Sequence, residues 1–222
     1  MDFARARYNM IESQVRTGSV IDPRVIAAMS EVPREVFVPG HLRDIAYIDE
    51  DLAIGADASG APRHLMEPLV FARMLQLADI DPEDCVLDVG CASGYSAAVL
   101  SKLAQSVIAL EQDKELAATA GANLEALGCV NAVVVNGPHA AGYGREAPYD
   151  VIVLNGRVEE EPQELLAQLK DLGRLVAVFG PARMARIRLW TRRGEVVSWV
   201  DHFDANVPLL AGFGPAGAAR AA

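Results

Sequence analysis

The sequence is poor in cysteine. Three cysteines occur in 222 residues, Cys85, Cys91 and Cys129, and no two of them form a CxxC pair. An odd number of isolated cysteines argues against a disulfide framework, and none of the four histidines stands at a metal-ligand spacing from them. We therefore expect no metal site and a reducing, cytoplasmic environment.

Long apolar runs and basic residues are also scarce. No uninterrupted apolar stretch approaches the ~20 residues that a membrane-spanning helix needs. Residues 1–8 carry charge, but no apolar segment follows them, which argues against a secretory signal. Lys and Arg number 20 against 30 Asp and Glu, so the formal net charge is −10. We expect neither nucleic acid nor a membrane as a partner, because both favour a basic surface.

Apolar residues, in contrast, make up 51% of the chain and form short runs that alternate with helix-favouring segments. Strands are predicted at 86–89, 107–111, 132–135, 149–154 and 174–179, and helices at 68–77, 114–127 and 162–172. This βα alternation predicts a mostly parallel sheet with right-handed crossovers. Two alternating runs, 186–191 and 195–200, flank Arg192-Arg193-Gly194 and predict a C-terminal antiparallel hairpin.

Residues 1–67 are expected to form an N-terminal extension of helices and loops, packed on a core of residues 68–210 as one domain. One helix should begin at Asp22-Pro23, because Asp is a good N-cap and Pro suits the first turn. Residues 52–68 are rich in turn-forming types and are expected to form a long loop, often a functional lid. The tail 211–222, rich in Gly and Ala, is expected to be flexible.

The chain is organised around a glycine bend after the strand 86–89. Gly90 and Gly94 let the backbone approach a ligand closely, and the helix that follows offers unpaired N–H groups. The spacing is Gly-x-x-x-Gly rather than the Gly-x-Gly-x-x-Gly of dinucleotide enzymes, and Asp88 precedes it. A carboxylate there would repel a phosphate but suits a cation such as the sulfonium of S-adenosylmethionine.

A second carboxylate, Glu111, ends the next predicted strand, where an acid can accept both hydroxyls of a ribose. The carboxyl ends of the strands should form one rim with the turns Asn136-Gly137 and Asn155-Gly156. Asn136 can read an adenine edge or serve only as a turn residue. The predicted cofactor-binding residues are Asp88, Gly90, Ala92, Ser93, Gly94, Glu111, Gln112, Asn136 and Gly137. A dinucleotide site is the weaker alternative, because of Asp88.

Several segments together resemble the protein-L-isoaspartate O-methyltransferase family over roughly residues 9 to 180. They are Val32-Pro33-Arg34-Glu35-Val36-Phe37-Val38-Pro39, Ala46-Tyr47, Leu52-Ala53-Ile54-Gly55, Pro68 through Ala72-Arg73-Met74, Gly94-Tyr95, Ala147-Pro148-Tyr149-Asp150, and Gln168-Leu169 through Gly173-Arg174-Leu175-Val176. The resemblance implies an α/β, Rossmann-like class I S-adenosylmethionine-dependent methyltransferase. It also implies a cytosolic, usually monomeric protein-repair enzyme that methylates the α-carboxyl group of isoaspartyl residues in damaged proteins.

The chain departs from the family pattern at three places. A Ser-Gln-Pro-like triplet, whose Ser or Thr faces the sulfonium, is here Met66-Glu67-Pro68. The loop before it is longer than usual, and its Ser59 is a possible substitute for the missing hydroxyl. The Gly-Asp-Gly of the adenine turn is Asn136-Gly137-Pro138, and the middle glycine of the bend is Ala92.

These departures leave the acceptor open. A carboxylate is already a nucleophile, whereas an amine or hydroxyl would need a base, and His64 or Glu67 is the candidate catalytic residue at that location. Either is also read as a solvated loop residue, and Glu67 would repel an isoaspartyl carboxylate. Two functions therefore compete: an isoaspartyl methyltransferase, and a catalytically silent or re-purposed cofactor-binding homologue with another acceptor or an interaction role. A dinucleotide-dependent oxidoreductase is a third, weaker reading.

Overall fold

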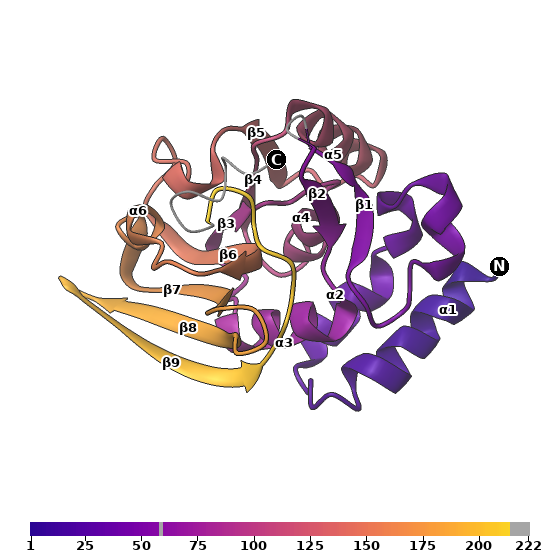
Figure 1. Cartoon of the computed structure of the whole chain (residues 1–222), viewed down its shortest axis with the longest axis horizontal. Helices are drawn as coiled ribbons and strands as arrows, with labels where there is room; N and C mark the ends of the chain where they lie inside the picture. The colour runs from indigo at the N-terminus through magenta and orange to yellow at the C-terminus, as the bar shows by residue number, and fades with distance from the viewer. Residues whose placement is uncertain (58–59, 214–222) are drawn as a thin grey trace.

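The structure is a computed structural model that describes residues 1–57 and 60–213. These residues form a seven-stranded sheet in the order β5-β4-β3-β6-β7-β8-β9 (Figure 1). The strands are β3 (Cys85–Val89), β4 (Ser106–Glu111), β5 (Ala132–Asn136), β6 (Tyr149–Val158), β7 (Leu169–Phe179), β8 (Arg186–Arg193) and β9 (Val196–Asp204). Neighbours from β5 to β7 run parallel, and β7-β8-β9 are antiparallel. The predicted parallel sheet with a C-terminal hairpin is confirmed.

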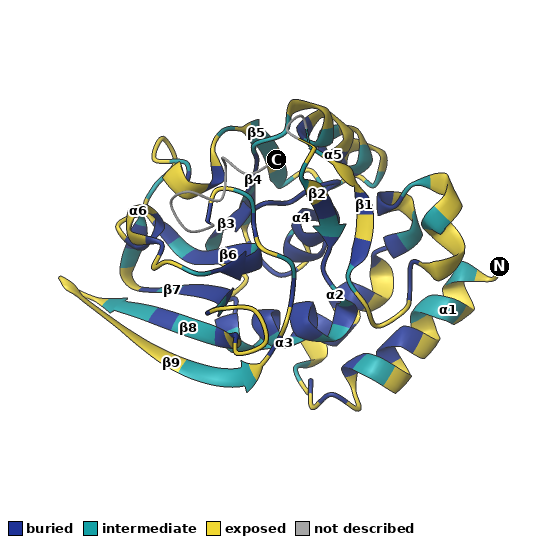
Figure 2. Cartoon of the chain, in the orientation of Figure 1, coloured by how far each residue is buried: buried dark blue, intermediate teal, exposed yellow. Residues whose placement is uncertain are grey.

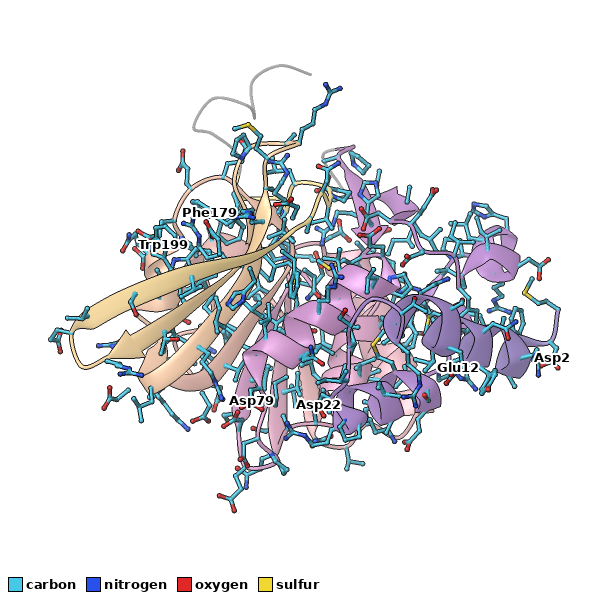
Figure 3. The ribbon with its side chains drawn as sticks, turned by 90° about the horizontal axis from the view of Figure 1, so that it is seen from below. Asp2, Glu12, Asp22, Asp79, Phe179 and Trp199 are labelled. Atoms are coloured by element: carbon cyan, nitrogen blue, oxygen red, sulfur yellow. The ribbon has the colours of Figure 1, made fainter. Side chains whose placement is uncertain are left out.

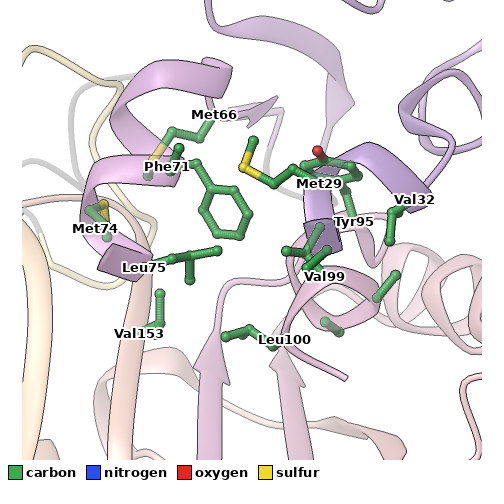
Figure 4. Packing of buried hydrophobic residues seen from close by; sticks show 14 of the residues in the cluster. Met29, Val32, Met66, Phe71, Met74, Leu75, Tyr95, Val99, Leu100 and Val153 are labelled. Carbon is green, nitrogen blue, oxygen red and sulfur yellow. The ribbon is translucent and has the colours of Figure 1, made fainter. Parts of the chain in front are cut away.

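The central strands are buried on both faces, as their continuous apolar runs predict. Helices α3 (Pro68–Ala78), α4 (Tyr95–Leu100) and α5 (Lys114–Ala126) pack along the sheet. In the core, the ring centroids of Phe71 in α3 and Tyr95 in α4 are 5.9 Å apart, and Met29 and Leu75 lie beside these rings (Figure 4). This core is contiguous with the apolar residues of the first 67 residues, so extension and sheet share one interior.

The N-terminal helices are α1 (Phe3–Met10), a π-helical turn η1 (Ile11–Val15) and α2 (Pro23–Glu31), followed by the 3-10 turns η2 (Arg34–Phe37) and η3 (Gly40–Ile45). The Asp22 side chain accepts the Arg24 N–H, and Pro23 opens the helix, which confirms the predicted start. Arg24 also pairs with Asp22 and Asp79, both labelled in Figure 3, and so ties α2 to the end of α3. None of the helices in the described part of the chain has the length and apolarity that crossing a bilayer takes.

Residues 52–68 are not the predicted loop. They contain an antiparallel hairpin of β1 (Leu52–Ala56) and β2 (Pro62–Leu65), with a register irregularity next to Gly55. Leu52, Ile54 and Leu65 turn inward and anchor it, while alternate residues stay exposed, which is the period of a half-buried strand. His64 and Leu65 of β2 line one small pocket together with Tyr95 and Ser96 of α4, so the hairpin lies beside α4 (Figure 1). Ser59, the possible substitute hydroxyl, lies outside the described residues.

The predicted helix 162–172 is also wrong over most of its length. Only α6 (Gln163–Leu166) is helical, and β7 begins at Leu169, paired with Tyr149 of β6. The Lys170 ammonium contacts the Asp150 carboxylate at 2.7 Å across these strands. Pairing with an already buried strand therefore overrides the local helix propensity.

The C-terminal hairpin is held by stacked side chains. The Arg188 guanidinium lies 4.0 Å from the Phe179 ring centroid and 3.7 Å from that of Trp199, the two labelled aromatics of Figure 3. Most of β9 is nevertheless exposed, as Figure 2 shows by its colours. Cation–π contacts of this kind fasten a strand that contributes few buried residues.

After β9 the chain returns across the carboxyl edge of the sheet. The Arg157 N–H donates to Pro208 O, and the Leu210 N–H donates to Arg157 O. Residues 211–213, which were expected to belong to a flexible tail, make packing contacts instead: Ala211 O contacts the His139 ring, and Phe213 is buried. Residues 214–222 lie outside the described part of the chain.

Candidate functional site

The glycine bend joins β3 to α4 at the carboxyl edge of the sheet. Gly90, Ala92 and Gly94 all have left-handed backbones, with φ of +77°, +50° and +99°. A Cβ on Gly94 would lie 3.2 Å from the Ala120 backbone, so glycine is needed there for space as well as conformation. Ala92 adopts the same conformation with its methyl group in place.

Asp88 lies beneath the bend and is fully buried. Its two carboxylate oxygens accept hydrogen bonds from the Ser96 hydroxyl at 2.7 Å and the Asn155 amide at 2.5 Å. Burial raises the pKa of Asp88 to about 7, although both hydrogen bonds act in the opposite direction. Asn155 was placed on this rim by its position after a strand, whereas Ser96 was not singled out.

Asp88→Asn should stabilise the protein at pH 8 by on the order of 4 kcal/mol and change little at pH 4. The folded-state pKa of Asp88, about 7, lies above the ordinary value of 3.8. The folded protein therefore holds this proton more tightly, and wild type loses that stabilisation as the pH rises from about 4 through 7. Asparagine keeps both contacts if Ser96 accepts instead of donating.

Urea unfolding at both pH values measures this difference. The exposed Asp44→Asn variant is the control for removal of an acidic charge. An equal gain for Asp88→Asn at pH 4 and pH 8 would contradict the assignment.

Glu111, at the end of β4, is also fully buried and is held in place by three N–H donors. Its oxygens accept from Arg63 Nη2 at 2.7 Å, from the Ala92 N–H at 2.9 Å and from the Asp113 N–H at 3.0 Å. Burial alone would raise the pKa of Glu111, but contacts with His139, Arg63 and the Asp113 N–H lower it to about 2. Glu111 is therefore ionised at the position where the sequence predicts a ribose-binding acid.

His139 is fully buried beside Glu111. Its Nε2 accepts the Gln112 N–H at 3.1 Å, its Nδ1 lies 3.0 Å from Ala211 O, and Nε2 is 3.4 Å from Glu111 Oε1. His139 and the Arg63 guanidinium therefore both belong to the surroundings that keep Glu111 ionised. Sequence reasoning missed both His139 and Arg63, although Arg63 is adjacent to the candidate His64.

Other predicted cofactor residues are already engaged. The Asn136 amide donates to the carbonyls of Glu111 at 2.8 Å and Gln112 at 3.0 Å, so it braces the turn and leaves its oxygen for a ligand. The Gly137 N–H donates to Glu111 O. The Ser93 hydroxyl donates to Phe37 O at 2.6 Å and faces the N-terminal extension rather than the bend.

The two candidate catalytic residues are placed differently. His64 and Met66 line two small pockets, one shared with Gly90–Ala92 and one with Val207–Ala211. Glu67 lines neither; it precedes α3, and its N–H donates to Asp51 Oδ1. Burial, followed by the nearby carboxylates of Asp51, Asp49 and Glu50, raises the pKa of Glu67 to about 7.

The polar groups of the site fit a nucleoside that carries a sulfonium: an ionised acid at a strand tip, a close-approach bend and a buried carboxyl group. Side chains fill the space over the glycine bend and over Glu111 that such a nucleoside would occupy. Leu210 covers the bend, since a Cβ on Gly90 would lie 2.6 Å from its Cδ1, and Arg63 covers Glu111. The two pockets hold about 20 and 10 Å³, room for about one water each. Entry of the cofactor therefore requires Leu210 and Arg63 to move.

Comparison with known proteins points to one family. A family profile described as protein-L-isoaspartate(D-aspartate) O-methyltransferase matches residues 5–209. A protein-L-isoaspartate O-methyltransferase of Methanoregula boonei is 41% identical over 189 residues, which cover 85% of both chains. A protein of the same name from Methanoculleus marisnigri is 38% identical over 95% of this chain and 94% of its own.

Two solved structures share the fold. One, described as a protein-L-isoaspartate O-methyltransferase, has a TM-score of 0.81 at 24% identity and covers 94% of this chain and 67% of its own. The other, a putative protein-L-isoaspartate O-methyltransferase from Plasmodium falciparum in complex with S-adenosyl-L-homocysteine, has a TM-score of 0.76 at 20% identity, covering 93% and 98%. On the match of the profile and of these relatives, the chain belongs to the protein-L-isoaspartate(D-aspartate) O-methyltransferase family.

Proposed function

We propose that this protein transfers a methyl group from S-adenosylmethionine to the α-carboxylate of isoaspartyl residues in proteins. The observation that carries the proposal is Glu111, a buried, ionised acid at the tip of β4 beside the glycine bend. Both the family and its named relatives are O-methyltransferases of this kind. The same family match leaves no support for the dinucleotide-dependent oxidoreductase.

We assign the cofactor contacts as follows. Glu111 accepts the two ribose hydroxyls, and the backbone of Gly90, Ala92 and Gly94 receives the amino-acid end above Asp88. The Asn136 oxygen, Gly137 and Gln112 lie on the adenine side. Ser93 contributes through its backbone, because its hydroxyl is already used by Phe37.

For this reaction the protein must mainly align the acceptor carboxylate with the methyl group. The bound cofactor supplies an activated methyl group, and a carboxylate acceptor needs no base to attack it, so positioning provides much of the rate enhancement. Met66 then has a role that needs no hydroxyl: it closes the acceptor side with an apolar side chain. His64, beside it, is the remaining candidate for a direct contact with the acceptor.

The raised pKa values near the acceptor side support this choice. Burial raises the pKa of Asp51 to about 6, and burial with neighbouring carboxylates raises that of Glu67 to about 7. Glu67 is therefore partly protonated at pH 7, which weakens the repulsion of an isoaspartyl carboxylate that the sequence alone suggests.

The test has two arms. Calorimetry should detect binding of S-adenosylhomocysteine, and labelled methyl should pass to an isoaspartyl peptide but not to its aspartyl twin. Binding of S-adenosylhomocysteine without transfer of labelled methyl to the isoaspartyl peptide would contradict the proposed reaction but not the proposed cofactor site.

Binding of S-adenosylhomocysteine without methyl transfer is the result expected of the alternative, a catalytically silent or re-purposed cofactor-binding homologue. Met66 in place of a hydroxyl and the covering of the bend by Leu210 favour it. A labelled product from any peptide would exclude a silent protein.

We further propose a monomer in a reducing compartment such as the cytoplasm. All the assigned contacts come from one chain, and Cys85, Cys91 and Cys129 are all free thiols. Light scattering at working concentration should give the mass of one chain; a stable dimer would contradict this part of the proposal.

A further inference from the structure

Arg63 is a buried cation that has an N–H group unpaired within the described part of the chain. It lies on β2, its residue is 5% exposed, and its Nη2 donates to Glu111 Oε2 at 2.7 Å. Its Nη1 is also buried and has no hydrogen-bond partner among the described residues. Arg63 lines the same pocket as His64, Met66 and Asn155, so this unused N–H group belongs to the edge of the site.

Arg63 and a ribose compete for the same carboxylate. Glu111 Oε2 already accepts both Arg63 Nη2 and the Ala92 N–H, and Oε1 accepts the Asp113 N–H. Two ribose hydroxyls need lone pairs on these oxygens, so the cofactor proposed above must displace the guanidinium. This step of the inference rests on the proposed function.

A displaced Arg63 needs another anion. A buried guanidinium without a counter-charge is strongly unfavourable, and the incoming sulfonium adds a second positive charge nearby. Asp51 lines the same pocket, but one of its oxygens already accepts the Glu67 N–H, and burial raises its pKa to about 6, which makes it a weaker counter-charge. Two carboxylates reach this site in the reaction. The one on the amino-acid end of the cofactor is assigned above to the backbone of the glycine bend, so the carboxylate of the acceptor is the one that remains for Arg63.

We propose that Arg63 is the acceptor-binding residue: as the cofactor takes Glu111, the guanidinium passes to the α-carboxylate of the isoaspartyl residue. The planar fork of arginine suits a carboxylate. If one carboxylate oxygen receives the N–H groups, the other keeps its lone pair to form the O–CH₃ bond. The S–CH₃ bond breaks, its electron pair stays on sulfur, and no proton moves. Arg63 thereby selects acceptors with a free carboxylate and orders binding, cofactor first.

The test measures peptide binding rather than turnover. A fluorescent isoaspartyl peptide, and the same peptide with an α-carboxamide, are titrated with enzyme saturated with S-adenosylhomocysteine. Arg63→Gln should weaken binding of the carboxylate peptide by at least about 30-fold and leave the carboxamide peptide unchanged. The affinity of Arg63→Lys for the carboxylate peptide should lie between those of wild type and Arg63→Gln. Binding of S-adenosylhomocysteine itself should be unchanged or tighter in Arg63→Gln, because its competitor for Glu111 is gone.

A matched control is Arg174→Gln, which removes an arginine paired with Asp84 at the opposite edge of the sheet and should change neither affinity. The proposal fails if Arg63→Gln affects both peptides equally or neither. It also fails if S-adenosylhomocysteine affinity falls, or if wild type does not distinguish the two peptides. Absence of methyl transfer with intact, Arg63-dependent binding would instead contradict the proposed reaction alone.

Discussion

Glu111→Ala should weaken binding of S-adenosylhomocysteine by at least about a hundredfold, the effect of losing two hydrogen bonds to a charged acceptor. The carboxylate is the one group in the described site that is buried, ionised and placed at a strand tip for a ribose. Its loss also leaves the Ala92 N–H without its acceptor, so the bend loses its brace. Isothermal titration with S-adenosylhomocysteine measures the change.

The same substitution should cost about 3–5 kcal/mol of stability, because Arg63 then remains as a buried charge without its partner. Adding Arg63→Ala should recover much of that stability and none of the affinity. This separation shows that the affinity loss is not a folding defect. Glu115→Ala, on the exposed side of α5, is the control, and unchanged affinity in Glu111→Ala would rule out this cofactor site.

Glu111 also makes stability depend on acidity. Its folded-state pKa of about 2 lies below the ordinary 4.5. The ionised carboxylate therefore stabilises the fold above pH 4.5, and this contribution disappears as the pH falls from 4.5 through 2. Glu111→Ala should consequently unfold with a weaker pH dependence than wild type in that range.

Arg34→Ala should destabilise the protein by about 3–5 kcal/mol, among the largest effects expected of a single substitution. Arg34 is fully buried; its Nε donates to Ala46 O and its Nη2 to Met66 O, each at 2.7 Å. Its guanidinium lies 4.8 Å from the Tyr95 ring centroid. Alanine would leave the buried carbonyls of Ala46 and Met66 unpaired and a cavity beside the Tyr95 ring.

Arg34→Met separates packing from hydrogen bonding. Methionine fills most of the volume and removes a buried charge, so its cost should be roughly half that of alanine. Because Met66 O loses its donor, this variant should bind the isoaspartyl peptide more weakly at unchanged S-adenosylhomocysteine affinity. Urea unfolding and the peptide titration measure these effects, with the exposed Arg43→Ala as control. A loss below about 1 kcal/mol for Arg34→Ala would contradict the role given to the buried guanidinium.

The sequence predicts those features that are encoded locally. Asp22-Pro23 identifies a helix start because capping depends on adjacent residues. The run 86–89 with Gly90 and Gly94 identifies a strand and bend, because a continuous apolar segment and left-handed glycines each have few other uses. The same reasoning places Asp88 and Glu111 together, since carboxyl ends of parallel strands share an edge.

What sequence reasoning missed depends on contacts between distant segments. Arg63 reads as an ordinary loop residue until β2 places it on Glu111, 48 residues away. His139 follows a turn that suggests solvent, yet the segment 205–213 buries it. The hairpin 52–65 was obscured by its two glycines and its proline, and β7 by a helix-favouring composition that its pairing with β6 outweighs.

The covering of the bend by Leu210 has a consequence for how the enzyme matures. Leu210 lies six residues after the end of β9, so during synthesis every strand of the sheet precedes the residue that covers Gly90. A nascent polypeptide thus completes its sheet with the bend still uncovered. The catalytic pocket acquires its final shape only when residues 205–213 dock, so synthesis that stops before them would leave the sheet without its cover.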